Sequence, residues 1–140
     1  MGSVKGIHHI SLTVSDVDRS IAFYRRFGLQ LETRGDTFGP EVEEGTGVPG
    51  ARLDEAFMTG ADVRLELIRY ADMEAHKAPP PNSVGSAHVC FLVRNMPEVY
   101  EELRSSGVEF VSPPHRQGNL DWVYFKDPDG ITVELLEQLD

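Results

Sequence analysis

Two histidines and two glutamates occupy matching places in the two halves of this sequence. His9 opens one apolar stretch and His88 opens a similar one at a shift of 79 in the numbering, while Glu66 and Glu134 correspond at a shift of 68. Two imidazoles and two carboxylates suit a divalent ion such as Zn, Ni, Co, Fe or Mn. The four residues therefore predict a metal site with free positions for water or substrate, where a bound ion lowers the pKa of water and polarises a carbonyl. A glutamate able to leave the ion, Glu66 or Glu134, could also act as a catalytic base.

Strand alternation predicts that all four candidate ligands point to the same kind of sheet face. His9 and Ser11 alternate with Ile10 and Leu12, and alternate residues of a strand point to opposite faces. The same alternation separates His88 and both glutamates from the aliphatic residues of their strands. A helix must cover the aliphatic face, so the other face should form a cup. A lone histidine or glutamate on a strand is usually structural, and it is the joint repetition that favours metal binding.

Each half is expected to form one βαβββ module. Period-2 segments predict opening strands at 6–14 and 87–93. Helices should follow, the first capped by Ser15 or Asp16 and ended by Gly28, the second capped by Asn95 and ended by Gly107. The remaining strands are predicted at 29–34, 52–59 and 62–70 in the first half and at 108–112, 121–126 and 131–138 in the second.

The two modules predict a single α+β domain over residues 1–140, with a curved mixed sheet around a metal-binding cup. The modules span 5–70 and 84–138, and the linker 71–83 contains Pro79-Pro-Pro81, which cannot lie in a central strand. The register shifted by 68 also places Phe57 on Phe125. Because the second shift is smaller than the first, the first half should carry a longer loop, Gly35 to Gly50. We expect this loop to be a mobile flap over the cup.

Other polar and aromatic residues are weaker candidates. His8 alternates with His9 and is expected to lie under the helix, whereas His76 and His115 fall in Pro-rich loops and should be solvated, with His115 also a candidate for the pocket mouth. Cys90 shares the cup parity but is expected to pack as a small hydrophobic residue. Trp122 and Tyr124 could face the pocket or join the core, and Arg52 and Arg64 could bind a substrate carboxylate or phosphate or simply be surface charges.

Composition limits the compartment and the partners. The chain has 13 basic and 23 acidic residues and a net charge of −10, which repels polyanions and makes nucleic acid an unsuitable partner. No apolar run reaches the roughly 18 residues of a membrane span, and the N-terminus has no signal pattern. Cys90 is the only cysteine, which fits a reducing compartment. We therefore expect a cytoplasmic protein with a small-molecule substrate.

The chain resembles the vicinal oxygen chelate superfamily, which includes glyoxalase I, methylmalonyl-CoA epimerase, extradiol dioxygenases and fosfomycin and bleomycin resistance proteins. The resemblance spans nearly the whole chain. It rests on His8-His-Ile-Ser-Leu-Thr-Val-Ser-Asp16 with Phe23-Tyr24, on Leu65-Glu-Leu67, on Gly85-Ser-Ala-His88, and on Asp127-Pro-Asp-Gly130 through Val133-Glu-Leu135. It implies a glyoxalase-like fold and metal positions at His9, Glu66, His88 and Glu134, the same set that parity and repetition indicate.

The resemblance also implies an activity. Members bind two neighbouring substrate oxygens on the metal, and the isomerases and epimerases stabilise an enolate or enediolate while glutamates move the proton. The expected protein is thus a metal-dependent lyase, isomerase or epimerase of the glyoxalase I or methylmalonyl-CoA epimerase type, with Glu66 or Glu134 as base. By the same analogy we expect a homodimer.

Two alternatives stay open. Extradiol ring-cleaving dioxygenases resemble this pattern but typically use two histidines and one glutamate on iron, with no carboxylate at the place of Glu66, so Glu66 favours lyase or isomerase chemistry. A metal-free, ligand-sequestering resistance protein is the other alternative, and the complete ligand set argues against it.

Overall fold

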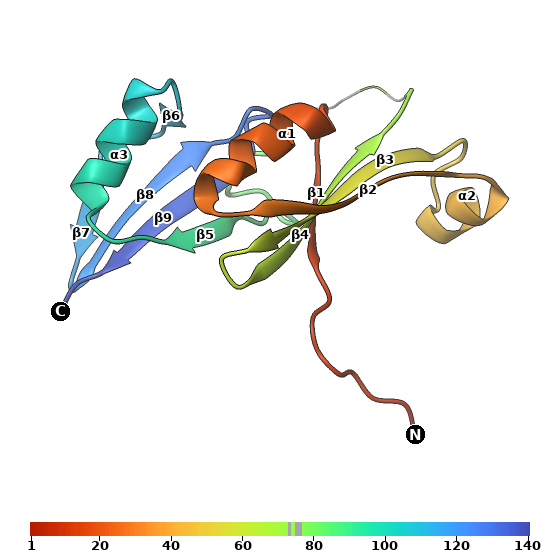
Figure 1. Ribbon diagram of the computed structural model, residues 1–140, viewed down its shortest axis with the longest axis horizontal. Helices are drawn as coiled ribbons and strands as arrows, with labels where there is room; N and C mark the ends of the chain where they lie inside the picture. The colour runs from red at the N-terminus through yellow and green to blue at the C-terminus, as the bar shows by residue number, and fades with distance from the viewer. Residues whose placement is uncertain (73, 75–76) are drawn as a thin grey trace. The chain divides into compact units, whose positions relative to one another are not determined.

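The computed structural model describes residues 1–140 except 73, 75 and 76 (Figure 1). The chain divides into two compact units, Met1–Ala75 and His76–Asp140. The prediction of a solvated His76 falls outside the described residues.

The first unit has one four-stranded mixed sheet in the strand order β1-β4-β3-β2. Strand β1 runs parallel to β4, and the other pairs are antiparallel. The elements are β1 (Ile10–Thr13), α1 (Val17–Tyr24), the 3-10 helix η1 (Arg25–Phe27), β2 (Gln30–Phe38), α2 (Pro40–Thr46), β3 (Arg52–Gly60) and β4 (Val63–Tyr70).

The second unit repeats this plan in a five-stranded mixed sheet. Its order is β5-β9-β8-β6, with β7 also paired to β8, and β5 runs parallel to β9. The elements are β5 (Val89–Leu92), α3 (Met96–Ser105), β6 (Glu109–Phe110), β7 (His115–Gln117), β8 (Leu120–Lys126) and β9 (Thr132–Gln138). The prediction of an α+β fold is therefore confirmed. The βαβββ order recurs in both halves, with helix α2 added in the first and strand β7 in the second, and both opening strands are shorter than predicted.

The aliphatic face of each sheet forms the core beneath a helix. In the first unit Leu65 and Leu67 are fully buried, and in the second Leu135 is fully buried and Val133 almost so. Each side chain of this kind stabilises the fold by about 1.5–3 kcal/mol relative to exposure. We call the opposite face of each sheet, which carries one candidate histidine and one candidate glutamate, its cup face.

Helix α1 begins as its sequence predicts, and the predicted stop, Gly28, ends the 3-10 helix η1 that continues it. The Asp16 carboxylate accepts a hydrogen bond of 2.9 Å from the backbone N–H of Arg19, which satisfies a donor of the first turn. Val17, Ile21 and Tyr24 are buried against the sheet. Gly28 follows η1 with φ +83°, a conformation that favours glycine.

Helix α3 is capped by a residue that its local sequence does not indicate. The predicted cap, Asn95, makes no side-chain capping bond; its amide donates instead to Glu98 at 2.6 Å. The Glu137 carboxylate from β9 accepts from the backbone N–H groups of Asn95 and Met96 at 2.6 and 2.7 Å. Asn95 occupies the predicted N-cap position, but its side chain does not cap the helix, because a neighbouring strand brings a full negative charge to the helix N-terminus.

The predicted loop from Gly35 to Gly50 is also wrong. Strand β2 continues to Phe38, and helix α2 follows it with Pro40 in its first turn. Val42 and Val48 pack with Tyr70 against the buried cluster of Ala51, Leu53 and Ile68. Since Ile68 follows Glu66 on the same face of β4, α2 covers one end of the cup face of the first unit.

Strand pairing corrects the internal alignment by one position. Phe57 lies opposite Glu66 in the first unit, and Tyr124, not Phe125, lies opposite Glu134 in the second. The segment that joins Tyr124 to Glu134 is thus one residue longer than the segment that joins Phe57 to Glu66. The turn between β8 and β9 is closed by the Asp127 carboxylate, which accepts from the backbone N–H groups of Asp129 and Ile131 at 2.9 and 2.8 Å.

Candidate metal-binding site

The first unit brings His9 and Glu66 together on its cup face. The imidazole Nε2 of His9 lies 3.9 Å from a carboxylate oxygen of Glu66, and the side chains are 33% and 12% exposed. The other carboxylate oxygen of Glu66 accepts a 2.7 Å hydrogen bond from the Ser11 hydroxyl. The register of β1 on β4 places Ser11 directly beside Glu66, so this contact is fixed by the sheet.

The second unit repeats the arrangement with His88 and Glu134. The imidazole Nε2 of His88 lies 3.0 Å from Glu134 Oε2, and the side chains are 33% and 15% exposed. Cys90 lies directly beside Glu134 in the register of β5 on β9. In both units a half-exposed imidazole thus faces a less exposed carboxylate.

Ser11 and Cys90 are equivalent positions in the repeat, because the shift that places His9 on His88 also places Ser11 on Cys90. Each touches the carboxylate of its own unit, one through a hydroxyl and the other through a thiol. Burial, reinforced by the negative charge of Glu134 and a hydrogen bond to it, raises the pKa of the Cys90 thiol to about 11. Cys90 is exposed and hydrogen-bonded to Glu134, so the expectation that it only packs as a small hydrophobic residue is wrong. Enough surrounding protein displaces water from the sulfur to disfavour the thiolate.

The donor atoms fit a divalent ion in their chemistry and in their spacing within a pair. Bonds of about 2.0–2.1 Å to nitrogen and oxygen place neighbouring donors about 3.0–3.4 Å apart. The His88–Glu134 separation of 3.0 Å falls in that range, and the His9–Glu66 separation of 3.9 Å lies about 0.5 Å beyond it. Within the part of the chain that the structure describes, no group of three or more His, Cys, Asp and Glu side chains could hold a metal ion. Each unit supplies one pair, and the convergence of all four on one ion stays a prediction.

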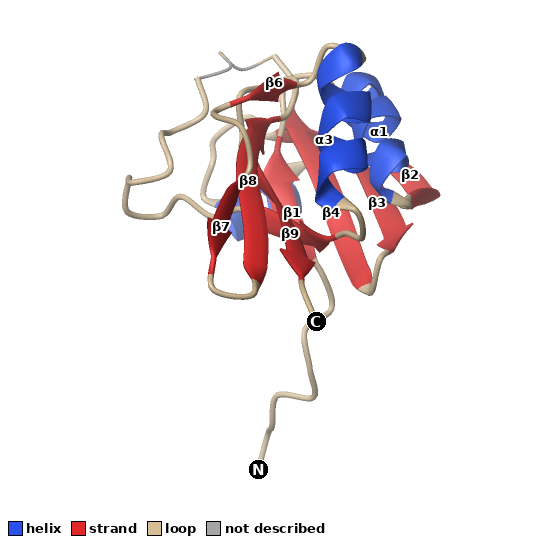
Figure 2. Cartoon of the chain, turned by 90° about the vertical axis from the view of Figure 1, so that its left-hand side faces the viewer, coloured by secondary structure: helices blue, strands red, loops and turns tan. Residues whose placement is uncertain are grey.

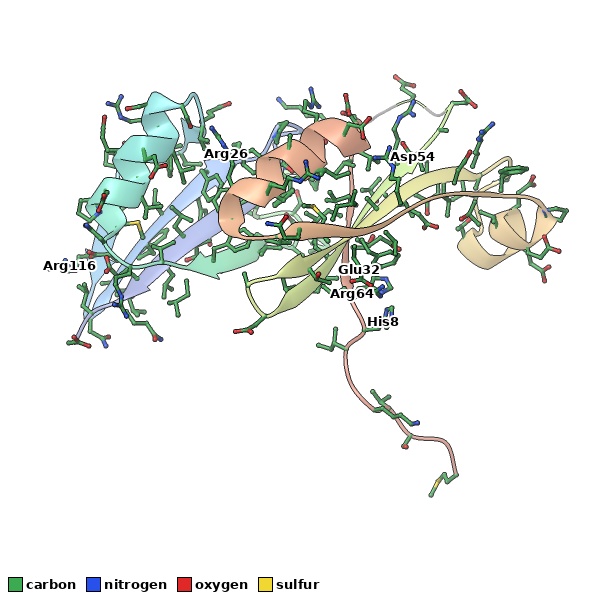
Figure 3. All side chains as sticks on the ribbon, in the orientation of Figure 1. His8, Arg26, Glu32, Asp54, Arg64 and Arg116 are labelled. Atoms are coloured by element: carbon green, nitrogen blue, oxygen red, sulfur yellow. The ribbon has the colours of Figure 1, made fainter. Side chains whose placement is uncertain are left out.

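Parity predicted that His8 lies under the helix, and this prediction is wrong. It is exposed and lies beside Arg64, whose Nη1 is 2.8 Å from His8 Nε2, and Figure 3 shows both residues near Glu32. Strand β1 begins only at Ile10, and His8, two residues before it, no longer follows strand alternation. Arg64 also donates two hydrogen bonds to Glu32, at 3.1 and 2.8 Å.

Arg64 is therefore a paired charge beside the candidate ligands. Its guanidinium carbon lies 4.2 Å from the centre of the Phe57 ring, and that ring is 5.1 Å from the ring of His9. The hydrogen bonds from Arg64 hold the pKa of Glu32 below its usual value. Arg52 likewise donates to Asp36 at 3.3 and 2.7 Å. The interpretation of both arginines as paired surface charges is the one that these contacts favour.

The second unit carries aromatic rings on its cup face. Tyr124 and Trp122 alternate with the buried Val123 and Phe125 along β8. The Tyr124 ring centre lies 5.1 Å from that of His88 and 5.5 Å from that of Trp122. His115 is exposed as expected, but it lies in strand β7, opposite Trp122, rather than in a loop. Its parity with Trp122 becomes visible only once β7 is recognised as a strand.

A hollow of about 510 Å³ lies on the other side of this sheet. It is lined by Met96, Pro97, Tyr100, Pro114, Arg116 and Asp121. Arg116 and Asp121 are opposite each other in the register and alternate with His115 and Trp122. The hollow is therefore separate from the His88–Glu134 pair.

Among the described helices, none is long and apolar enough to cross a membrane.

Comparison with known proteins assigns the chain to a family. The family described as the Glyoxalase/Bleomycin resistance protein/Dioxygenase superfamily matches residues 6–135. This chain belongs to that superfamily, as its paired βαβββ units and repeated His–Glu pairs predicted.

Similar sequences carry several names. Protein YwkD of Bacillus subtilis is 30% identical, with 96% of this chain and 98% of that protein covered. A lactoylglutathione lyase of Pseudomonas aeruginosa is 31% identical (93% and 81% covered). A 2-epi-5-epi-valiolone epimerase of Actinomyces is 27% identical (93% and 78% covered).

Solved structures share the fold. A glyoxalase family protein from Bacillus cereus superposes with a TM-score of 0.86 at 26% identity, covering 99% of this chain and 97% of that one. A variant of the fosfomycin resistance protein FosX from Listeria monocytogenes, complexed with Mn(II) and 1S,2S-dihydroxypropylphosphonic acid, superposes with a TM-score of 0.64 at 20% identity, covering 95% and 92%.

Proposed function

We propose that this protein is a metal-dependent lyase, isomerase or epimerase that moves a proton on the carbon next to a carbonyl of a small substrate. The observation that carries this proposal is the repeated trio on the two cup faces. Each unit pairs one histidine with one glutamate, and the same strand position beside each glutamate supplies a hydrogen-bonding side chain. The named activities of two relatives, a lyase and an epimerase, fit this reaction class.

His9, Glu66, His88 and Glu134 are the proposed ligands of one divalent ion: Zn, Ni, Co, Mn or Fe. When bound, such an ion polarises a carbonyl oxygen and lowers the pKa of a bound water. The repeated pairs support this set, because each pair alone offers only two protein ligands, fewer than the three that catalytic zinc sites ordinarily have. Light scattering should show the homodimer that we also propose for this chain.

The side chain at the repeated strand position differs between the two glutamates, and this difference favours Glu134 as the base. His88, which lies 3.0 Å from Glu134, does not restrain it in the loaded protein, because its nitrogen would then hold the ion. Ser11 donates a short hydrogen bond of 2.7 Å to Glu66, whereas Glu134 has a thiol in that place, which is a weak donor. A carboxylate that accepts a hydrogen bond from a hydroxyl loses more hydrogen-bond free energy when it moves than one that contacts a thiol. Glu66 is thus suited to stay a ligand and Glu134 to move and take the proton. A positioned base of this kind contributes about 10²–10⁴-fold to a rate.

The test is solvent deuterium exchange at the substrate α-carbon. Metal-free protein is loaded in turn with each of the five ions and offered a 1,2-dicarbonyl, a 2-hydroxyketone and an acyl-CoA. We expect exchange without net oxidation in at least one loaded form. Glu134→Gln should reduce it about 100-fold or more, while Glu101→Gln, which removes an exposed carboxylate paired with Arg104, should leave it unchanged. Equal exchange in metal-free and metal-loaded protein would refute the proposal.

The same preparations test the two alternatives. Oxygen uptake on catechols by the iron-loaded protein would replace the proposal with ring cleavage. Failure of the protein to bind any of the five ions would replace it with a ligand-sequestering role.

A further inference from the structure

The cup face of the second unit carries an aromatic strip that the proposed proton transfer does not use. We define the strip as His88, Tyr124, Trp122 and His115. The successive ring centres are 5.1, 5.5 and 5.7 Å apart, within the range of favourable aromatic contacts. It begins at a proposed metal ligand and ends on the edge strand β7.

The strip is not part of the core. Phe125 on the opposite face is fully buried and packs with Phe110. By contrast, Trp122 and Tyr124 are only half-buried and His115 is exposed. Leu136 lies opposite Trp122 and is half-buried, and Leu92 on β5 is 68% exposed. The strip is therefore an apolar surface that solvent reaches.

Charge and geometry indicate what would cover it. The rings of Tyr124 and Trp122 are uncharged, while one end of the strip meets His88 and Glu134, 3.0 Å apart. A ligand whose oxygens reach that end would place its neighbouring atoms over Tyr124 and then Trp122, since the ring centres follow one another at 5.1 and 5.5 Å. A flat unsaturated ring suits this surface, because aromatic faces attract other rings beyond simple burial.

We propose that the substrate carries a flat aromatic or unsaturated ring next to its pair of metal-binding oxygens, and that the ring packs on Trp122 and Tyr124 with His115 at its far edge. This inference rests on the proposed function for the position of the oxygens. The competing explanation is that the rings only stabilise the pairing of β7 with β8, as cross-strand aromatic pairs do.

Trp122 is the only tryptophan, so its fluorescence reports on the strip directly. The probes are benzohydroxamate and acetohydroxamate, which offer the same two oxygens with and without a ring, titrated into zinc-loaded protein. We expect benzohydroxamate to bind about 10-fold more tightly or better and to change the Trp122 emission, whereas acetohydroxamate should not. Equal affinities for the two hydroxamates, with unchanged Trp122 emission, would refute ring binding on the strip while leaving the metal-site proposal standing.

Substitutions in the strip locate the ring. His115→Ala removes an exposed ring outside the proposed ligand set, and it should weaken benzohydroxamate about 3- to 10-fold, the size of one aromatic contact, while leaving acetohydroxamate unchanged. Trp122→Phe should retain most of the preference for the ring and Trp122→Leu should lose it, as measured by calorimetry.

The matched control is Lys77→Ala, at an exposed position between β4 and β5. It should change the affinity for neither hydroxamate. A preference for benzohydroxamate that survives both His115→Ala and Trp122→Leu would place the ring elsewhere and refute the proposal.

A third probe separates this proposal from the metal site. 1-Naphthol has a flat ring but only one oxygen, and it should quench Trp122 in the metal-free protein, more weakly after His115→Ala. If neither hydroxamate binds to the protein loaded with any of the five ions, the proposed metal function fails, and naphthol quenching then still supports ring binding on the strip. If neither benzohydroxamate nor 1-naphthol quenches Trp122, ring binding on the strip is refuted.

Discussion

Ser11 and Cys90 show how one atom can distinguish two carboxylates at matching places in a repeat. The Ser11 hydroxyl holds Glu66 at 2.7 Å, and the Cys90 thiol contacts Glu134 more weakly. If Glu134 must move to act as a base, a stronger donor at position 90 should restrain it.

Cys90→Ser should therefore slow α-carbon exchange. A hydroxyl–carboxylate bond in place of a thiol contact strengthens the hold on Glu134 by about 0.5–1.5 kcal/mol, which corresponds to a rate about 2- to 10-fold lower. The measurement is the exchange rate at saturating metal. The control is Ser11→Cys, which loosens Glu66 and should weaken metal binding instead. A faster Cys90→Ser enzyme would contradict the assignment of Glu134 as base.

The raised pKa of Cys90 gives a pH prediction for the metal-free protein. With a pKa of about 11, only about one thiol in a thousand is ionised at pH 8, and the thiolate is the reactive form. Alkylation by iodoacetamide should be slow at pH 8 and should rise about tenfold per pH unit up to pH 10. Glu134→Gln removes a negative charge, lowers the pKa of the thiol and should speed alkylation at pH 8. Rapid alkylation of the unaltered protein at pH 7 would contradict this prediction.

At the scale of elements, two glycines have opposite expected effects on stability. Gly60, at the end of β3, has φ +144°, and a Cβ there would lie 2.1 Å from the carbonyl oxygen of Gly28. Gly60→Ala should destabilise the protein by about 2–5 kcal/mol, because backbone strain adds to a clash with backbone. Urea unfolding measures the change.

Gly45 is the matched control. It lies within α2, and no atom is within 4 Å of the position that its Cβ would take. Gly45→Ala should stabilise the protein by about 0.5–1 kcal/mol, since alanine loses less backbone entropy in a helix. A neutral Gly60→Ala would show that Gly28 and Gly60 are not in close contact.

The elements also show what the sequence could predict. Alternation in β4 and β9 correctly separated the aliphatic core from Glu66 and Glu134, because burial imposes the period of two on a strand. His9 and His88 each lie one residue before their strand and still follow its alternation. Helix α2 was missed because its short sequence contains a glycine and a single aliphatic residue, Val42, and its packing on Ile68 depends on tertiary contact. The Glu137 cap was missed because it comes from β9, far along the chain from α3.

The candidate site was predictable in its residues and less so in its surroundings. The repeat identified the four donors and, by the same shift that pairs the histidines, already placed Ser11 on Cys90. The contacts of Ser11 and Cys90 with the glutamates depend on the parallel register of β1 on β4 and of β5 on β9, which a single sequence does not specify. His8 was misplaced because alternation extends only one residue before β1, to His9, and no longer holds at His8.

At the scale of the whole molecule, the four-ligand proposal predicts a metal stoichiometry. Each unit holds two donors, so the complete set should bind one ion per chain, and His9→Ala and His88→Ala should each weaken binding about 10-fold or more. Equilibrium dialysis with elemental analysis measures both the number and the affinity. Two ions per chain, with each variant losing only one, would show that the pairs act separately.

Figure 2 shows each sheet with its helix on one side, and the hairpins β3–β4 and β8–β9 carry the glutamates of both units. The hairpin of the second unit has the longer turn, yet its glutamate still lies on the cup face. An extra residue within a strand would have turned Glu134 to the buried side. Because the extra residue lies in the turn instead, Glu134 keeps its orientation. Variation in chain length is therefore tolerated at this turn, and an engineer could lengthen it further, or graft a peptide there, while keeping the acid group in its place.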